Sequence, residues 1–279
     1  MTVKTIDLYK EFGLSKKQGQ EGTLTCWTHF QSSEINENRL RPAMLVLGGG
    51  GYSFVSDRER EPVALEYFAQ GYNVFDLKYS VKPFAYPTQL LEACMAMAYI
   101  RKHADEFGVI EDKVAAVGFS AGGHLLGTLS TLYNDPEVKK VVGDINVRPD
   151  ASVFSYAVIS SGELTHAGSI ANVTGGDDGL KEKLSVEKQI DKFSPPAFIW
   201  CTADDGCVPC ENSLMLAAAY KKAGVPFELH VFESGVHGLS VCSAESGRVD
   251  SACLINEPVS KWLPLSFTWL KNRGFSIKD

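Results

Sequence analysis

Ser120 lies in a segment whose residue types could carry out acyl transfer. The sequence around it is Gly-Phe-Ser-Ala-Gly, a Gly-x-Ser-x-Gly pentapeptide. A serine hydroxyl is a weak nucleophile until a neighbouring imidazole takes its proton, so this serine would need a histidine and a carboxylate. Gly118 and Gly122 carry no side chain, as a sharp turn that exposes the serine hydroxyl requires. The pentapeptide therefore predicts that Ser120 is a nucleophile.

Two later segments offer the partners that such a serine needs. Asp204 and Asp205 follow an apolar run, and His237 lies in a glycine-flanked segment after another. We expect His237 to take the serine proton and later to protonate the leaving alkoxide or amine. One carboxylate would hold the imidazole tautomer and stabilise the imidazolium. The other histidines are less suited, because His230 lies within a predicted strand and His124 one helical turn past the serine, where structural roles are simpler.

A run of four glycines, residues 48–51, could supply a different part of the same chemistry. It directly follows the continuous apolar run at residues 43–47, which is typical of a strand buried on both faces. Such a loop can turn its own N–H groups toward a developing oxyanion; a merely flexible turn is the alternative. A dinucleotide fingerprint would need glycine in place of Ser53, and a phosphate-binding loop would need Gly-Lys-Ser/Thr, so neither applies.

Strands must deliver these segments to one edge of a sheet. Apolar and β-branched runs predict strands at residues 43–47, 72–79, 114–117, 152–159, 197–202 and 227–232. Patterns with helical period predict helices at residues 61–70, 88–107, 125–133, 211–223 and 259–271. This alternation predicts an α/β domain around a mostly parallel sheet, with the strand ends that carry the site at one edge. Before it, residues 23–41 suggest an antiparallel hairpin with a polar turn.

No repeat or linker divides the sequence, so we interpret residues 1–279 as one domain. Residues 161–194 have no strong period and contain a Gly-Gly-Asp-Asp-Gly run. We expect them to form a cap or lid insertion over the site.

Composition excludes several classes of function. The apolar share of 44% and the charged share of 22% are those of a globular protein. A net charge of −7 without a basic cluster argues against nucleic acid as a partner. No apolar run approaches a membrane span, and the first residues lack a signal peptide, so we expect a cytoplasmic protein with no membrane partner. The sequence leaves the oligomeric state open, with a homo-oligomer among the alternatives.

The seven cysteines are most simply reduced thiols, since their number is odd and no secretion signal accompanies them. Cys207 and Cys210 form a Cys-x-x-Cys pair that could suggest a metal or redox site. No second pair at metal-ligand spacing accompanies them. We therefore expect no metal and no cofactor, and a structural role for these two residues.

Four stretches together resemble a known family. They are Leu-Gly-Gly-Gly-Gly-Tyr, Gly-Phe-Ser-Ala-Gly-Gly-His-Leu, Pro-Pro-Ala-Phe-Ile-Trp-Cys-Thr-Ala-Asp-Asp and Phe-Glu-Ser-Gly-Val-His-Gly-Leu. They are similar to the bacterial acetyl esterase/lipase-like branch of the α/β-hydrolase superfamily, which includes acetyl-xylan-esterase-like proteins. The resemblance covers residues from about 43 to 239. It implies an α/β-hydrolase fold with a mostly parallel sheet of about eight strands and helices on both faces.

The resemblance also implies roles for individual residues. The N–H groups of Gly50, Gly51 and Ala121 would form the oxyanion hole. In the family His or Pro commonly precedes three glycines; here Gly48 stands in that position, which predicts a freer loop. The family's acid commonly stands three residues before a Val-Pro pair, and this spacing selects Asp205 rather than Asp204.

The sequence therefore predicts a serine carboxylester hydrolase that needs no cofactor and acts on a small-molecule ester. Tyr52, Phe54 and Leu239 flank the predicted catalytic loops and would line a short acyl pocket, although core packing would explain them almost as well. Short acyl groups such as acetyl, on sugars among other alcohols, are the expected substrates. An amidase, formamidase or peptidase with the same triad is the alternative within enzymes. A non-catalytic binding protein is the alternative from another class, but it would not need all four parts of the site.

Overall fold

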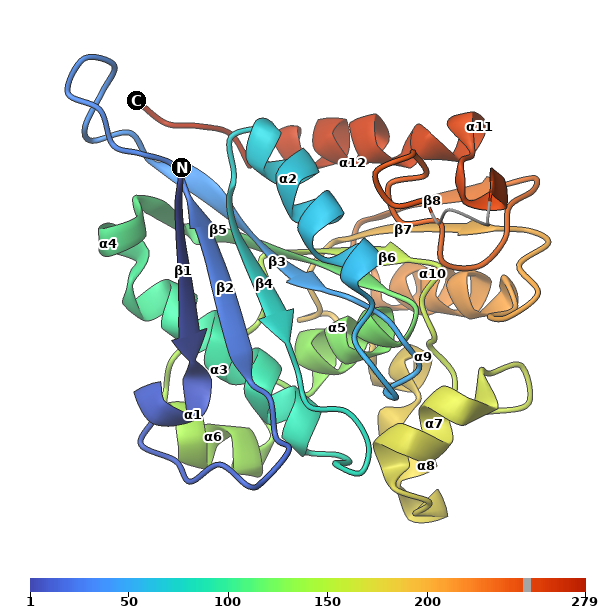
Figure 1. Ribbon diagram of the computed structural model, residues 1–279. Coiled ribbons are helices and arrows are strands. Elements are labelled where there is room, and N and C mark those ends of the chain that lie inside the picture. Colours follow the sequence, from blue (N-terminus) through green and yellow to red (C-terminus); the bar gives the residue numbers. More distant parts are fainter. Residues whose placement is uncertain (248–251) are drawn as a thin grey trace.

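A single sheet forms the centre of the computed structural model, which describes residues 1–247 and 252–279 (Figure 1). Eight strands in these residues lie in the order β1-β2-β4-β3-β5-β6-β7-β8. Their bounds are β1 (Thr2–Asp7), β2 (Thr23–Thr28), β3 (Arg41–Leu47), β4 (Asn73–Lys78), β5 (Val109–Phe119), β6 (Ala151–Ser155), β7 (Ala197–Thr202) and β8 (Phe227–Phe232). Neighbours from β4 to β8 are parallel, and β2 is antiparallel to both β1 and β4. The predicted mostly parallel sheet is confirmed.

The central strands are apolar throughout because both of their faces are covered. Every residue of β6 and β7 is buried, as are all residues of β3 after its first. Strands of this kind read as continuous apolar runs rather than as alternating ones. This is why the sequence located them so well.

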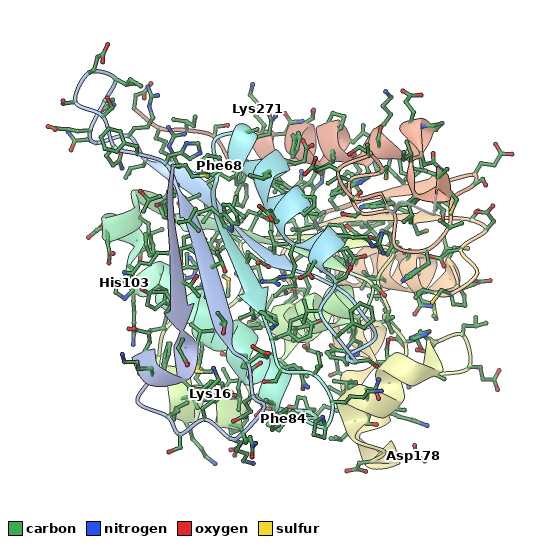
Figure 2. The ribbon with its side chains drawn as sticks, in the orientation of Figure 1. Lys16, Phe68, Phe84, His103, Asp178 and Lys271 are labelled. Carbon is green, nitrogen blue, oxygen red and sulfur yellow. The ribbon has the colours of Figure 1, made fainter. Side chains whose placement is uncertain are left out.

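Helices cover both faces of the sheet (Figure 1). One face packs against α3 (Thr88–Lys102), α5 (Ala121–Thr131), α6 (Pro136–Val142) and α10 (Glu211–Ala223). The other packs against α2 (Glu61–Ala69) and α12 (Trp262–Lys271), and Figure 2 shows Phe68 and Lys271 on that side. Trp262 of α12 is buried and stacks on Trp200 of β7, with 5.0 Å between ring centroids. Short helices α1 (Leu8–Glu11), α4 (Ala104–Phe107) and α11 (Glu257–Ser260) complete the layers.

Several local predictions were wrong. The early hairpin does not form between β2 and β3, because β4 lies between them in the sheet and β2 pairs with β1 and β4. Alternating burial along β2 fits any neighbour, so its pairing partner is set by the rest of the sheet. The helix predicted at residues 88–107 is two helices, α3 and α4, separated at His103. The strand predicted to reach residue 159 ends at Ser155.

The cap segment, residues 161–194, contains short helices rather than irregular chain. They are α7 (Ala167–Thr174), η2 (Asp178–Leu180), α8 (Lys181–Leu184) and α9 (Val186–Gln189). In Figures 1 and 2 they lie together at one end of the molecule, with Asp178 at their outer end. Whether this segment moves as a lid stays a prediction. Within the described residues, no helix has the length and apolar character needed to cross a membrane.

Candidate active site

Ser120, His237 and Asp205 form one hydrogen-bonded chain. The Ser120 Oγ lies 2.8 Å from His237 Nε2, and His237 Nδ1 lies 2.7 Å from Asp205 Oδ2. The second carboxylate oxygen of Asp205 accepts the backbone N–H groups of Cys207 and Val208 at 2.8 and 3.0 Å. The Asp205 side chain is completely buried. An acid fixed in this way can hold one tautomer of the imidazole and leave Nε2 directed at the serine.

The backbone at Ser120 is strained in the manner of a nucleophile elbow. Its φ is 51° and its ψ is −120°, between the end of β5 and the start of α5. The two flanking glycines permit close contacts, because a Cβ on Gly118 would lie 2.5 Å from the Gly122 carbonyl oxygen, and one on Gly122 would lie 2.2 Å from that of Leu47. No larger residue fits at either position. The sequence pattern is thus explained by packing around the turn.

The predicted oxyanion-hole donors surround the same serine. Gly50 and Gly51 lie in the glycine loop, residues 48–52, and line the cavity that contains Ser120. Ala121 is the first residue of α5. Within the described residues, no protein acceptor takes the backbone N–H of any of the three. Gly50 has φ 122°, and a Cβ there would lie 2.2 Å from the Phe54 carbonyl oxygen, so glycine is required.

The glycine loop is held by hydrogen bonds with side chains that the sequence analysis did not single out. The Gly49 N–H donates to the Glu59 carboxylate at 2.7 Å, and the Tyr79 hydroxyl donates to the Gly48 carbonyl at 2.6 Å. From the cap segment, Asn172 donates its side-chain N–H to the Gly51 carbonyl at 2.8 Å. The glycine at position 48 predicted a freer loop, but these contacts hold it on three sides.

The cavity beside Ser120 has a volume of about 330 Å³. Its lining includes Gly50 and Gly51 of the glycine loop, Phe54, His237 and, from the cap segment, His166 and Asn172. A volume at the small end of ligand pockets suits a small substrate. The cap segment thus contributes to the wall, as its position in the sequence suggested.

Two of the three residues expected to line the acyl pocket are placed elsewhere. Tyr52 and Leu239 are both completely buried and are not among the described residues that line this cavity. Tyr52 instead points under the glycine loop, where its hydroxyl lies 2.9 Å from His124 Nδ1, and Leu239 packs in the core beside α12. Only Phe54, which is 60% exposed, lines the cavity. Adjacency in sequence to a catalytic loop did not distinguish a pocket wall from the core beneath it.

The two neighbouring aspartates have different surroundings. Asp204 is exposed and accepts hydrogen bonds from the Ser234 hydroxyl at 2.6 Å and the Gly235 N–H at 2.7 Å. These bonds lower the pKa of its carboxyl below the usual value. Asp204 therefore holds the start of the loop that carries His237.

The remaining candidates take structural positions. His124 is completely buried between the Tyr52 hydroxyl and the Leu184 carbonyl, and burial lowers its pKa to about 4. It is therefore neutral near pH 7, with a proton on Nε2 to donate to Leu184. Cys207 is exposed and Cys210 partly so, and neither is in a disulfide. Among the described residues, no group of three His, Cys, Asp or Glu side chains could hold a metal ion.

Sequence reasoning missed Glu59 and Tyr156, which lie at the centre of the site. Glu59 lies in an Arg-Glu-Arg-Glu run that reads as a solvated helix start, yet it is only 3% exposed. Tyr156 lies in an apolar run and reads as core. The Tyr156 ring packs edge-on against the His237 ring at 5.0 Å between centroids. A charged residue just before a helix gives no signal of burial, so only the three-dimensional structure reveals it.

The sheet, the elbow and the hydrogen-bonded Ser-His-Asp chain define a serine hydrolase of the carboxylesterase type with the α/β-hydrolase fold. A family model supports the same class, since the model of the BD-FAE family matches residues 32–220. The chain belongs to the BD-FAE family of α/β-hydrolases. The predicted resemblance to acetyl-esterase-like α/β-hydrolases is thereby confirmed.

Individual relatives agree with this assignment. The crystal structure of an acetyl ester-xyloside bifunctional hydrolase from Caldicellulosiruptor lactoaceticus is 33% identical, with a TM-score of 0.82, and the match covers 98% of this chain and 97% of that one. Endo-1,4-beta-xylanase B of Butyrivibrio fibrisolvens is 36% identical over 75% of this chain and 34% of its own length. An acetylxylan esterase of Xylanibacter ruminicola is 27% identical over 82% of this chain and 46% of its own length. The chain thus spans about a third to a half of these two curated relatives.

Proposed function

We propose that this protein is a serine carboxylester hydrolase that removes short acyl groups, acetyl above all, from esters that include acetylated sugars. The observation that carries the proposal is the Ser120–His237–Asp205 chain, with distances of 2.8 and 2.7 Å, in a cavity walled by the glycine loop. A binding protein would have no use for a strained serine, a directed imidazole and free N–H groups in one place. The catalytic roles of the individual residues are part of this proposal.

The reaction would proceed through an acyl-enzyme. His237 Nε2 takes the proton of Ser120 Oγ as that oxygen attacks the ester carbonyl carbon. The carbonyl oxygen becomes an oxyanion and receives hydrogen bonds from the N–H groups of Gly50, Gly51 and Ala121. The imidazolium then protonates the leaving alcohol oxygen as the C–O bond breaks. Water, deprotonated by His237, attacks the acyl-enzyme and releases the carboxylic acid and free Ser120.

The size and polarity of the site support the substrate class. The cavity of about 330 Å³ leaves room for a short acyl group. A second cleft of about 510 Å³ shares Cys207 and His237 with it, and its lining includes the polar side chains of Asp204, Ser234 and Asn256 beside Val236 and Cys253. Hydroxyl, amide and carboxylate groups of this kind match the hydroxyls of a sugar alcohol. The names of the relatives, which specify acetyl ester-xyloside hydrolysis and acetylxylan ester hydrolysis, point the same way.

A substrate panel tests the proposal. We expect turnover of p-nitrophenyl acetate and of acetylated xylo-oligosaccharides, with kcat/KM falling from acetyl to octanoyl esters. Each methylene that the cavity cannot accommodate should cost about 1–3 kcal/mol. An optimum at octanoyl would instead indicate a lipase-like groove. Faster turnover of N-formyl amides than of esters would support the amidase alternative.

Active-site labelling tests the nucleophile. An organophosphonate that reacts with activated serines should modify the wild-type protein on the peptide that contains Ser120. The Ser120→Ala variant should remain unlabelled and inactive while keeping the fold. Equal labelling of the two proteins would show that the nucleophile is another residue.

A further inference from the structure

Beside the triad, a buried carboxylate bridges two loops that the triad itself does not connect. Glu59 ends a short helical turn, η1 (Asp57–Glu59), and is 3% exposed. One of its oxygens accepts the Gly49 N–H at 2.7 Å, and the other accepts the Tyr156 hydroxyl proton at 2.7 Å. Because a buried carboxylate without partners would be very costly, both bonds are needed where it lies.

The Tyr156 hydroxyl continues the bridge to the histidine loop, residues 233–242. Its oxygen accepts the Ser240 N–H at 2.9 Å while its proton goes to Glu59. Burial, together with the nearby carboxylate, raises the pKa of this hydroxyl well above its usual range, so it keeps its proton. The Tyr156 ring also packs edge-on against His237. A single tyrosine therefore contacts the general base and, through its hydroxyl, the loop that carries this base.

The turn that holds Glu59 contacts the histidine loop at two more points. Arg58 donates from its guanidinium to the Gly238 carbonyl at 2.7 Å, and its own carbonyl accepts the Ser240 hydroxyl. Tyr156 and Ser240 both have positive φ, at 36° and 53°. Non-glycine residues persist in such conformations only where their surroundings determine them, and this occurs mostly at functional sites.

The glycine loop at the other end of the bridge directly contacts the nucleophile. A Cβ on Gly49 would lie 2.8 Å from both the Ser120 Cβ and the Glu59 carboxylate. The Gly49 N–H is used by Glu59, whereas Gly50 and Gly51 line the cavity, and their N–H groups have no acceptor among the described residues. A shift of this loop relative to Ser120 would move the oxyanion donors by the same amount, and an error of about 1 Å can cost about a hundredfold in rate.

We propose that Glu59 and Tyr156 are positioning residues that hold the oxyanion loop and the histidine loop in register across Ser120. The inference rests on the proposed esterase function, since it assigns the parts that the bridge keeps aligned. Neither residue transfers a proton to the substrate. Their contribution is geometric and appears only when the oxyanion forms.

Two conservative variants test this role with p-nitrophenyl acetate as substrate. Glu59→Gln keeps the volume but replaces one acceptor oxygen with an N–H₂ group, so Gly49 N–H or Tyr156 O–H loses its acceptor. Tyr156→Phe removes only the hydroxyl. We expect kcat to fall about a hundredfold in Glu59→Gln and at least tenfold in Tyr156→Phe, with KM within twofold of the wild type. The double variant should lose no more than the worse single one, because both break one network.

A transition-state analogue separates positioning from general stability. A trifluoromethyl ketone adds to the serine and places an oxyanion in the hole, so its affinity should weaken by the same factor as kcat/KM. Tyr9→Phe is the matched control, since the Tyr9 hydroxyl donates to buried Glu92 at 2.8 Å and neither residue is among those that line the cavity. We expect this control to retain wild-type kcat and inhibitor affinity.

The outcomes distinguish the proposed function from the positioning role of Glu59 and Tyr156. An inactive wild-type protein would refute the proposed function, whereas an active wild type with Glu59→Gln and Tyr156→Phe at full kcat would refute only the positioning role. A rise in KM with unchanged kcat would make Glu59 a substrate contact and would also refute it. An equal loss of kcat in Tyr9→Phe would also refute the positioning role, because the loss would then not be specific to the bridge. If Glu59→Gln does not fold, Tyr156→Phe decides, and if neither folds the bridge serves the fold and the inference fails.

Discussion

The two edges of the sheet differ in whether residues other than glycine adopt left-handed backbone. At the edge where strands begin, glycines take the positive φ angles. Gly71 precedes β4, Gly108 precedes β5 and Gly224 comes shortly before β8, with φ of 91°, 62° and 71°. Glycine adopts these angles with no Cβ to clash, so such turns carry little strain.

At the opposite edge, side chains occupy similar angles. All five described non-glycine residues with positive φ lie in loops that follow strands β3, β5, β6 and β8 at the carboxyl edge, namely Tyr52, Ser120, Tyr156, Ser240 and Cys242. Each such conformation costs about 1–3 kcal/mol. The difference teaches that, among the described residues, side chains occupy such strained angles only at the edge that presents the site, where specific contacts are needed. Hydrogen bonds such as those of Glu59 and Tyr156 offset the cost of these angles.

The largest expected effect separates the two aspartates of the strained edge. Asp205→Asn should lower kcat by about 10⁴, or about 5 kcal/mol, because the amide favours the wrong imidazole tautomer. Asp204→Asn should keep most activity, since its carboxylate bonds Ser234 and Gly235, whereas His237 bonds Asp205. Steady-state kinetics on folded variants distinguishes them. The opposite ranking would transfer the role of the acid to Asp204.

These two residues also show what a sequence can predict. The strand ends and the glycine pattern predicted Ser120 and His237 from local chain direction, whereas the choice of Asp205 over Asp204 came from the spacing to a Val-Pro pair in the resembling family. The mostly parallel sheet followed from long apolar runs, whereas its size of about eight strands and the helices on both faces were implied by the family resemblance. Chemistry that depends on the backbone next to a strand end can therefore be predicted from the sequence.

The rest depended on contacts between distant segments. Glu59 and Tyr156 are 97 residues apart, and nothing in either segment indicates the other. Tyr52 and Phe54 are two residues apart, yet one is buried and the other forms the pocket wall, because both lie in a turn in which the Ser53 and Phe54 N–H groups bond the Gly50 carbonyl and Tyr52 has positive φ. The pairing of β2 with β1 was hidden for the same reason. Tertiary context decided each case.

We expect acid to lower the free energy of unfolding through His124, whose ring bonds Tyr52 at the strained edge. Burial lowers the pKa of His124 to about 4, from about 6.5 when unfolded. The unfolded state therefore binds more protons between these values, and stability present at pH 7 is lost as the pH falls through this window. The free energy of unfolding in urea should fall by about 2 kcal/mol between pH 7 and 5 from this group alone.

The contribution of His29 must be removed by substitution before the loss of stability in acid can be assigned to His124. Burial also lowers the pKa of His29 to about 4, although this side chain is only half buried. The acid dependence should persist in His29→Gln. In NMR spectra the His124 ring should show no protonation above pH 5. A titration of this ring near pH 6.5 would contradict the buried, Nε2-protonated state.

Strain at the nucleophile predicts a gain in stability when function is abandoned. Ser120→Gly and Ser120→Ala should both be inactive, but only glycine relieves a φ of 51° with a ψ of −120°. Relief of about 2 kcal/mol, reduced by the greater unfolded-state entropy of glycine, leaves Ser120→Gly roughly 1.5 kcal/mol more stable than Ser120→Ala. Urea unfolding measures the difference. Equal stabilities would show that the elbow stores no strain.

The smallest expected effect concerns the relaxed edge. Gly224 ends α10 with φ 71°, and a Cβ there would meet no atom within 4 Å, so an alanine tests the backbone alone. A left-handed alanine costs about 1–2 kcal/mol, partly offset because alanine loses less entropy than glycine on folding. Gly224→Ala should therefore lower the free energy of unfolding by about 1 kcal/mol and leave kcat and KM unchanged. A loss of activity in this variant would mean that the two edges are coupled, and strain could then no longer be treated as a property of the site edge alone.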